Sequence, residues 1–303
     1  MSSEGEDMDY HRPENSMPIA YLNGEYVDLG DARVSVEDRG FLFADGVYEV
    51  VRFYCGRAFR LAEHLRRLSH SATGACLSLP DAVRDLPSII ERVLTDSSPS
   101  GNGEVYVQCT RGVAHPRSHP FPLDTRPTLL VMPIPLHVPP ERALSDGLSV
   151  TTTPDLRWGR CDIKSTMLLP NVIAKQQARE RGAFEAVFVR GDIITEGAST
   201  NLFAVIEGCL TTHPADCAVL GGISRQVVLE LAHDLGLQLR EAPFTLEQLR
   251  SSQEVMLTST TIEVLPVTQV DGQAIGNGLP GPTALRLYEA FQKLTADLRR
   301  ATD

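Results

Sequence analysis

Apolar residues repeat along the first half of the chain with two periods, one typical of strands and one typical of helices. Asn23-Gly24 separates the first two apolar runs and is typical of a type I′ hairpin turn. Alternation predicts strands at residues 19–22, 25–27, 47–54, 104–110 and 128–132. Helical spacing predicts helices from Leu61 to Ala72 and over 81–96, with Pro87 as a point where the second can kink. Residues 37–46 and 111–124 are expected to be loops.

The second half alternates more regularly between the two patterns. A clear amphipathic helix follows Gly221-Gly222, with Val227, Val228, Leu231 and Leu235 facing inward. Strands are predicted at 148–153, 185–189, 200–205, 238–241 and 254–261. Helices are predicted at 168–181, from 223 onward, and at 246–251 and 284–299. Residues 190–192 are expected to be a turn, and the small residues from Thr195 to Ser199 are compatible with a tight turn before the strand at 200–205.

These patterns predict two domains within the 303 residues. Residues 1–17 are acidic and polar and are expected to be a disordered extension. Residues 18–133 form a smaller N-terminal α/β domain, and residues 146–303 form a larger C-terminal domain. Between them, prolines cluster in residues 134–145, which we interpret as a semi-rigid linker.

Charge and cysteine content narrow the functional classes. The net charge of −11 argues against a nucleic-acid partner. The sequence has no apolar run of the roughly 20 residues that a membrane-spanning helix needs, and the N-terminus lacks the apolar core of a secretory signal. The six cysteines form no C-x-x-C pair and no zinc-finger spacing, so we expect reduced thiols, no metal site and a cytoplasmic protein.

Lysine is rare in this sequence, and one lysine stands in an unusual place. Of 28 basic residues only Lys164, Lys175 and Lys293 are lysine. Lys175 and Lys293 fall in polar helical runs and are expected on solvated faces. Lys164 follows an extended run and precedes an apolar one. Since lysine can lose its proton and attack a carbonyl whereas arginine cannot, Lys164 is either a candidate Schiff-base residue or a remnant of arginine bias.

Two further segments together are compatible with a phosphate site. Gly221-Gly222-Ile223-Ser224 precedes a helix, so backbone amides can approach an anion and Ser224 can cap the helix. Thr258-Ser259-Thr260-Thr261 places four hydroxyls in a row. Each segment alone also fits a plain turn or ordinary strand propensity, and neither is a nucleotide-binding fingerprint.

A carboxylate and a basic pair complete the candidate chemistry. Glu196 stands among small residues, where it either caps a turn or holds a proton on a heterocyclic nitrogen, as pyridoxal phosphate requires. Arg117-Ser118-His119 lies in the proline-rich loop of the first half. This pair either clamps a substrate carboxylate or forms a solvated basic loop.

Several of these segments together resemble the fold-type IV pyridoxal-phosphate aminotransferases, and among them the D-amino-acid (D-alanine) transaminases. The resemblance spans the chain from Ile19 onward. The Arg-x-His pair after Thr-Arg-Gly is its more specific signal. The segments that carry it are Glu37-Asp38-Arg39-Gly40, Asp45-Gly46-Val47-Tyr48-Glu49, Glu63-His64-Leu65-Arg66-Arg67-Leu68, Thr110-Arg111-Gly112, Pro116-Arg117-Ser118-His119, Arg160-Cys161-Asp162-Ile163-Lys164-Ser165, Thr195-Glu196-Gly197 with Asn201, and Thr258-Ser259-Thr260-Thr261.

The resemblance implies a two-domain α+β or α/β fold with pyridoxal 5′-phosphate between the domains. Lys164 would form the Schiff base, and Glu196 would face the pyridine nitrogen. The remaining roles are phosphate binding by Arg67, Ile223, Ser224 and Thr260, ring contact by Leu220, and binding of the substrate carboxylate by Tyr48, Arg117 and His119. Ser224 stands where relatives have threonine, which keeps the hydroxyl.

The implied activity is ping-pong transamination between a D-amino acid and a 2-oxo acid, such as 2-oxoglutarate, in a homodimer. Alternatives within the family are L-branched-chain transamination, (R)-amine transamination and aminodeoxychorismate lysis. A protein that uses the fold for ligand storage or regulation without catalysis is an alternative of another class, which Lys164 argues against. The resemblance implies nothing about the N-terminal extension.

Overall fold

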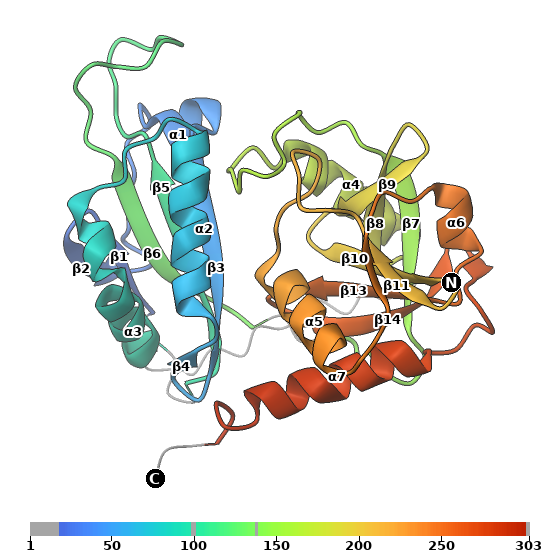
Figure 1. Cartoon of the computed structure of the whole chain (residues 1–303). Coiled ribbons are helices and arrows are strands. Elements are labelled where there is room, and N and C mark those ends of the chain that lie inside the picture. Colours follow the sequence, from blue (N-terminus) through green and yellow to red (C-terminus); the bar gives the residue numbers. More distant parts are fainter. Residues whose placement is uncertain (1–17, 98–100, 137–138, 301–303) are drawn as a thin grey trace, which may run out of the picture.

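The computed structural model describes residues 18–97, 101–136 and 139–300. The predicted extension, residues 1–17, lies outside the described residues. Two β-sheets stand side by side, each covered by helices, with the chain crossing from one to the other near its middle (Figure 1). The predicted two-domain α+β class is confirmed.

The elements of the first sheet and its helices are β1 (Ile19–Leu22), β2 (Glu25–Asp28), α1 (Arg39–Phe43), β3 (Gly46–Tyr54), β4 (Arg57–Ala58), α2 (Leu61–Gly74), η1 (Asp81–Asp85), α3 (Leu86–Ser97), β5 (Gly103–Thr110) and β6 (Thr128–Ile134). The elements of the second part are η2 (Glu141–Ala143), β7 (Leu148–Pro154), α4 (Leu169–Glu180), β8 (Glu185–Arg190), β9 (Ile193–Gly197), β10 (Asn201–Ile206), β11 (Cys209–Thr212), α5 (Ile223–Asp234), β12 (Leu239–Glu241), α6 (Leu246–Arg250), β13 (Glu254–Ser259), β14 (Glu263–Val270), β15 (Gln273–Ala274) and α7 (Pro282–Thr295).

The first sheet is antiparallel throughout, in the order β2-β1-β6-β5-β3-β4. Leu22 pairs with Glu25 across a two-residue turn. Asn23 and Gly24 have φ values of 52° and 106°, which the predicted type I′ turn requires. The strands and the helix from Leu61 are confirmed in this half.

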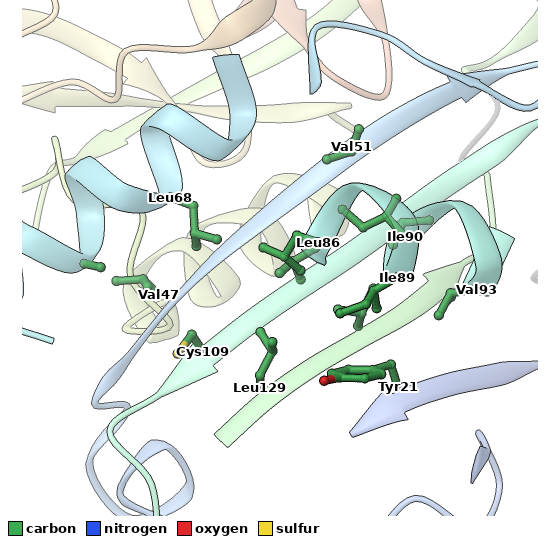
Figure 2. Packing of buried hydrophobic residues seen from close by; sticks show 14 of the residues in the cluster. Tyr21, Val47, Val51, Leu68, Leu86, Ile89, Ile90, Val93, Cys109 and Leu129 are labelled. Carbon is green, nitrogen blue, oxygen red and sulfur yellow. The ribbon is translucent and has the colours of Figure 1, made fainter. Parts of the chain in front are cut away.

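One face of the first sheet forms a core with α2 and α3. Leu68 of α2 and Ile90 of α3 are fully buried against Val51 of β3 and its neighbours. Figure 2 shows these side chains converging from both helices and from the strands. Burying each such side chain stabilises the fold by about 1.5–3 kcal/mol. Because side chains alternate along a strand, residues next to the core positions of β3 point to the opposite face.

Two predictions in this half are wrong in detail. The expected loop at 37–46 contains α1, which Asp38 caps by accepting a hydrogen bond of 2.7 Å from the amide of Gly40. The helix predicted over 81–96 is two elements, η1 and α3, with Pro87 at the second position of α3. The N–H groups in the first turn of a helix have no acceptor within the helix, so a proline, which has no N–H group, is tolerated there. Pro87 therefore lies at the start of this helix and does not kink it.

The second sheet mixes parallel and antiparallel pairs in the order β12-β11-β10-β13-β14-β7-β8-β9, with β15 beside β14. The strands β9, β11, β14 and β15 were not predicted. β9 occupies residues that the sequence suggested as part of a tight turn, so Glu196 lies on a strand. The sequence of β9 lacks the usual alternation of apolar and polar residues, because the sheet buries the polar residues Thr195 and Glu196. The strand could therefore not be recognised from its pattern.

Helix α7 joins the second sheet to the far end of β3. The hydroxyl of Tyr54 donates a hydrogen bond of 2.6 Å to Glu263, and Arg299 lies 2.6 Å from the same carboxylate. Phe59 and Phe291 complete an apolar cluster around Tyr54. The two sheets therefore meet along a packed surface and not only through the connecting chain.

The predicted linker, residues 134–145, runs from the end of β6 through η2, and residues 137–138 lie outside the described residues. The proposed domain boundaries stay a prediction. All six cysteines belong to the described residues and are free. In the described part of the chain, no helix is both long and apolar enough to cross a membrane.

Candidate functional site

Lys164 lies where the two sheets meet. Ser165 forms a β-bridge with Val47, and the amide of Tyr48 donates a hydrogen bond of 3.0 Å to the carbonyl of Lys164. The Lys164 amide in turn donates to the hydroxyl of Ser71 at 3.0 Å. The Nζ atom stands 4.3 Å from the centre of the Tyr48 ring. Among the described residues no carboxylate lies within 4.0 Å of Nζ, so this amine is not engaged in an ion pair.

The other two lysines have different surroundings. Lys293 is exposed on α7, as predicted. Lys175 keeps 41% of its side chain exposed on α4, in line with the predicted solvated face, but its Nζ atom also lies 3.2 Å from the buried carboxylate of Glu185 and donates to the carbonyl of Phe184 at 2.7 Å. Lys175 therefore anchors α4 to β8.

Arg67 forms an ion pair with the buried carboxylate of Glu49. Glu49 follows Tyr48 on β3 and therefore points to the opposite face of the sheet, toward α2. It accepts hydrogen bonds from Nε and a terminal nitrogen of Arg67 at 2.7 and 2.8 Å, and it lies 2.8 Å from Nδ1 of His64. Burial opposes ionisation, but the charge and hydrogen bonds of Arg67 lower the pKa of Glu49 to about 2. An ionised Glu49 thus fixes the guanidinium of Arg67.

The N-terminus of α5 lies beside Arg67. Its N-cap is Gly222, so the suggestion that Ser224 caps the helix is wrong, and no side chain of the described residues caps it. Ser224 is the buried second residue of the helix. A Cβ atom on Gly222 would lie 1.9 Å from Oδ1 of Asn201, which explains the glycine.

A pocket of about 350 Å³ opens at this helix end, and Arg66, Arg67, His70, Gly221 and Ile223 contribute to its wall. A helix N-terminus without a side-chain cap and with an arginine beside it is suited to a phosphate. Among the described residues, no three His, Cys, Asp or Glu side chains form a group that could hold a metal ion.

Glu196 points from β9 into a polar cage. One carboxylate oxygen accepts a hydrogen bond from Arg157, and the other accepts from Nδ2 of Asn201 at 3.0 Å and from the amide of Leu220 at 3.1 Å. Complete burial favours the neutral carboxyl, whereas Arg157 favours the carboxylate. Burial has the larger effect and raises the pKa of Glu196 to about 7.

Arg157 is a site residue that the sequence did not reveal. It donates to both oxygens of the buried Asp155 at 2.9 and 3.0 Å as well as to Glu196. Arginine is common in this chain, so its residue type gave no signal. The available clue was Asp155-x-Arg157 directly after a strand, a spacing that lets the two side chains pair locally.

Short links connect the three parts of the site. The amide of Leu220 binds Glu196, and the next carbonyl, of Gly221, accepts a hydrogen bond of 3.0 Å from Arg67. Arg67 and Ser71 lie one turn apart on α2, and Ser71 binds the backbone of Lys164. These hydrogen bonds link the segments that carry Lys164, Arg67 and Glu196 to one another and to the N-terminus of α5.

Of the remaining predicted residues, some lie near Lys164, Glu196 or the N-terminus of α5, and others have no contact with them within the described residues. Tyr48 faces Lys164, and the half-buried Leu220 lies on the segment that links Glu196 to α5. Thr260 lies in the turn after β13, two residues beyond the strand position that pairs with Asn201. No hydrogen bond joins Thr260 to Arg67 in the part of the chain that is described.

Arg117 and His119 do not join this group. They lie in the connection between β5 and β6, which extends beyond the end of the first sheet on the side of α1 (Figure 1). The guanidinium carbon of Arg117 lies 4.4 Å from the centre of the Phe43 ring, and the His119 ring lies 5.3 Å from it. Within the described residues, no hydrogen bond, ion pair or ring contact connects either side chain to Lys164 or Tyr48.

Comparison with known proteins shows one family. The sequence model of the family described as "Amino-transferase class IV" matches residues 46–270. The D-alanine aminotransferase of Staphylococcus epidermidis is 40% identical over 277 residues, which cover 91% of this chain and 98% of that protein.

Solved structures of branched-chain amino acid aminotransferases share the fold. The Escherichia coli enzyme has a TM-score of 0.84 at 27% identity and covers 92% of this chain and 95% of its own. A second branched-chain aminotransferase, solved with pyridoxamine 5′-phosphate, has a TM-score of 0.83 at 28% identity and covers 94% and 96% of the two chains.

The raised pKa of Glu196 predicts a pH-dependent stability for the ligand-free protein. The native pKa of about 7 lies above the ordinary value of 4.5, so the native state binds this proton more tightly than the unfolded state. The stability from neutral Glu196 is present below pH 4.5 and is lost as the pH rises toward 7. The expected loss is roughly 3 kcal/mol, measured by chemical denaturation across this range.

Glu196→Gln should remove this slope, whereas Glu180→Gln, at an exposed position on α4, should keep it. A slope that persists in Glu196→Gln would assign the titration to another group.

Proposed function

The chain belongs to the class IV aminotransferase family, and we propose that it transfers the amino group of a D-amino acid such as D-alanine to a 2-oxo acid such as 2-oxoglutarate. It is a pyridoxal-phosphate-dependent aminotransferase. The observation that carries the proposal is the amine of Lys164, free of ion pairs among the described residues, on a segment that short hydrogen-bonded links connect to a phosphate-suited helix end and to a buried carboxyl. The likeness to D-alanine aminotransferases over 91% of the chain supports the choice of substrate.

The side chains fit the cofactor at each of its functional groups. Arg67 and the amides of Ile223 and Ser224 suit its phosphate, with the hydroxyl of Thr260 on the turn after β13. Leu220 suits a ring face. Glu196 suits the ring nitrogen, because a carboxyl with a pKa of about 7 can share its proton with a pyridine nitrogen.

When bound, pyridoxal phosphate supplies an aldehyde that bonds to amines and a ring that accepts an electron pair from Cα. Lys164 would hold the cofactor through Nζ, and its amine, once free, would accept the proton from Cα of the substrate and return it in the next step. Tyr48, whose ring packs beside Nζ, limits the directions from which the amine can approach. Glu196 would keep a proton on the ring nitrogen.

The stereochemistry depends on where the substrate carboxylate is held. Tyr48, Arg117 and His119 bind that carboxylate, so the hydrogen that faces Lys164 is the one removed. Arg117 and His119 are exposed and have no contact with Lys164 or Tyr48 among the described residues of their own chain, so we infer that a second copy of the chain supplies them. The protein therefore works as a homodimer with each pocket at the interface. Its location in the cytoplasm stays a prediction.

L-branched-chain transamination is the second candidate, because the solved structures described above are branched-chain aminotransferases. It requires a carboxylate site of the opposite hand. The Arg-x-His pair favours the D-amino-acid reaction over this alternative.

A panel of half-reactions tests the proposal. D-alanine should shift the visible cofactor band of the purified protein, whereas L-leucine should not. Arg117→Ala and His119→Ala should each lower kcat/KM for D-alanine about a hundredfold, because the carboxylate loses a charged partner. Turnover of (R)-1-phenylethylamine, which has no carboxylate, should change less than about twofold.

Arg126→Ala is the matched control, since Arg126 is an exposed residue of the same connection. Equal losses on both substrates would refute the carboxylate clamp, and a band shift with L-leucine alone would favour the branched-chain alternative. A colourless protein that cannot be loaded with pyridoxal phosphate would favour a non-catalytic role.

Mixing two inactive variants tests whether the clamp acts between subunits. Lys164→Ala and Arg117→Ala, refolded together at equal amounts, should recover about a quarter of wild-type activity at low D-alanine, because about half of the randomly assembled dimers are hybrids and each hybrid has one complete site. Lys164→Ala mixed with Lys164→Arg controls for refolding and should recover nothing. Failure of the first mixture to recover activity, despite formation of hybrids, would place the clamp in the same chain as its lysine.

A further inference from the structure

A buried cluster of one carboxylate and two arginines lies at the base of the segment that carries Arg117 and His119. Asp45 accepts hydrogen bonds of 2.8 Å from Nε of Arg39 and from Nε of Arg111, and a third of 3.0 Å from Arg111. Arg39 and Arg111 are 4% and 8% exposed, so the cluster is almost closed to solvent. Neither arginine belongs to the cofactor or proton chemistry described above.

The two arginines hold different parts of the molecule. Arg111 reaches back to the C-terminal end of α2, where it donates to the carbonyls of Ala75 and Cys76 at 2.9 and 2.7 Å. Arg39 reaches the segment Arg117-Ser118-His119, the clamp segment, and donates to the carbonyls of Ser118 and His119 at 2.6 and 3.1 Å. Arg39 thus binds the backbone carbonyl groups before and after the Cα atom of His119.

The side chains of the clamp also rest on the element that carries Arg39. Phe43, at the other end of α1, lies under the guanidinium of Arg117 and against the ring of His119. The guanidinium carbon of Arg39 lies 4.9 Å from the centre of the same ring. Helix α1 therefore contacts the segment of Arg117 and His119 in two ways: Arg39 binds its backbone, and Phe43 packs against both side chains.

The cluster is itself anchored. The amide of Arg39 donates to the carbonyl of Gly112 at 2.9 Å, and the amide of Arg111 donates to the carbonyl of Asp45 at 3.0 Å. Burial opposes ionisation of Asp45, but hydrogen bonds from Arg111 and Arg39 lower its pKa. Asp45 is thus a lasting negative charge that orients both guanidinium groups.

We propose that Arg39 is a positioning residue for substrate specificity: it orients Arg117 and His119 by fixing the carbonyls of Ser118 and His119 against α1. The inference rests on the proposed function, because it assumes that Arg117 and His119 bind the substrate carboxylate. Its specific content is that a residue with no hydrogen bond, in the described part of the chain, to Lys164, Arg67 or Glu196 determines how well a carboxylate is recognised.

The geometry of arginine is what this role requires. The guanidinium of Arg39 directs three nitrogens at once to Asp45, Ser118 and His119. Lysine keeps the positive charge for Asp45, but its single nitrogen on a flexible stem cannot hold the three acceptors in one plane. Arg39→Lys therefore removes the orientation of the clamp while preserving the buried ion pair.

Five measurements on Arg39→Lys, loaded with cofactor, test the proposal. The D-alanine concentration for half-maximal rate should rise about tenfold, because a displacement of the order of 1 Å can cost up to about a hundredfold. The inhibition constant of propionate, a carboxylate without an amino group, should rise by the same factor. Turnover of (R)-1-phenylethylamine and the cofactor dissociation constant should stay at wild-type values. The melting temperature should fall by only about a few degrees, because the variant loses hydrogen bonds to two carbonyls but keeps the ion pair with Asp45.

Arg33→Lys is the matched control, because Arg33 is exposed and donates to two backbone carbonyls, those of Gly30 and Ala32. It should leave every one of these quantities unchanged. A parallel loss of amine turnover and cofactor binding in Arg39→Lys would show a merely structural role and overturn the proposal. So would an unchanged response to both D-alanine and propionate.

Arg117→Ala separates this inference from the proposed function. If Arg117→Ala weakens propionate binding and Arg39→Lys does not, only the positioning role fails. If Arg117→Ala leaves propionate and D-alanine unaffected, the clamp itself is wrong and both proposals fail.

Discussion

The pairing of residues 163–166 with the first residues of β3 is the interaction on which the site depends. Backbone hydrogen bonds from Tyr48 to Lys164 and from Thr166 to Gly46, both 3.0 Å long, lay a segment of the C-terminal half along the free edge of the first sheet. Strand pairing of this kind sets the register, and the register determines which side chain points into the site. A shift of one residue would turn Lys164 to the other face and bring Ile163 or Ser165 to its place.

Strand β3 then distributes the chemistry between its two faces. Tyr48 points toward Lys164, and the neighbouring Glu49 points toward α2, where it fixes Arg67. One short stretch of strand thus controls both the amine and the arginine beside the α5 terminus. At its start, Asp45 ties the same strand to the segment of Arg117 and His119. The segments that carry Lys164, Arg67 and the pair of Arg117 and His119 are therefore all attached within a few residues of β3.

The sequence revealed residues whose chemistry is unusual for their surroundings. Lys164 was found because lysine is rare here, and the glycines before α5 were found because close backbone approach requires them. Arg157 was missed because arginine is common and its importance comes from Glu196, a partner far along the chain. Glu196 was assigned to a turn, since β9 is stabilised by neighbouring strands and not by its own pattern. The locations of Arg117 and His119 could not be predicted, because they depend on contacts with Arg39 and Phe43 of α1, which is far away in the sequence.

The central claim is that the amine of Lys164 bonds covalently to the cofactor, and borohydride reduction followed by peptide mapping tests it most directly. Reduction makes the bond permanent, so the labelled peptide identifies the lysine. The account predicts a pyridoxyl group on the peptide that contains Lys164 and on no other. A label on Lys175 or Lys293, or the absence of any label from protein that carries the cofactor, would contradict it.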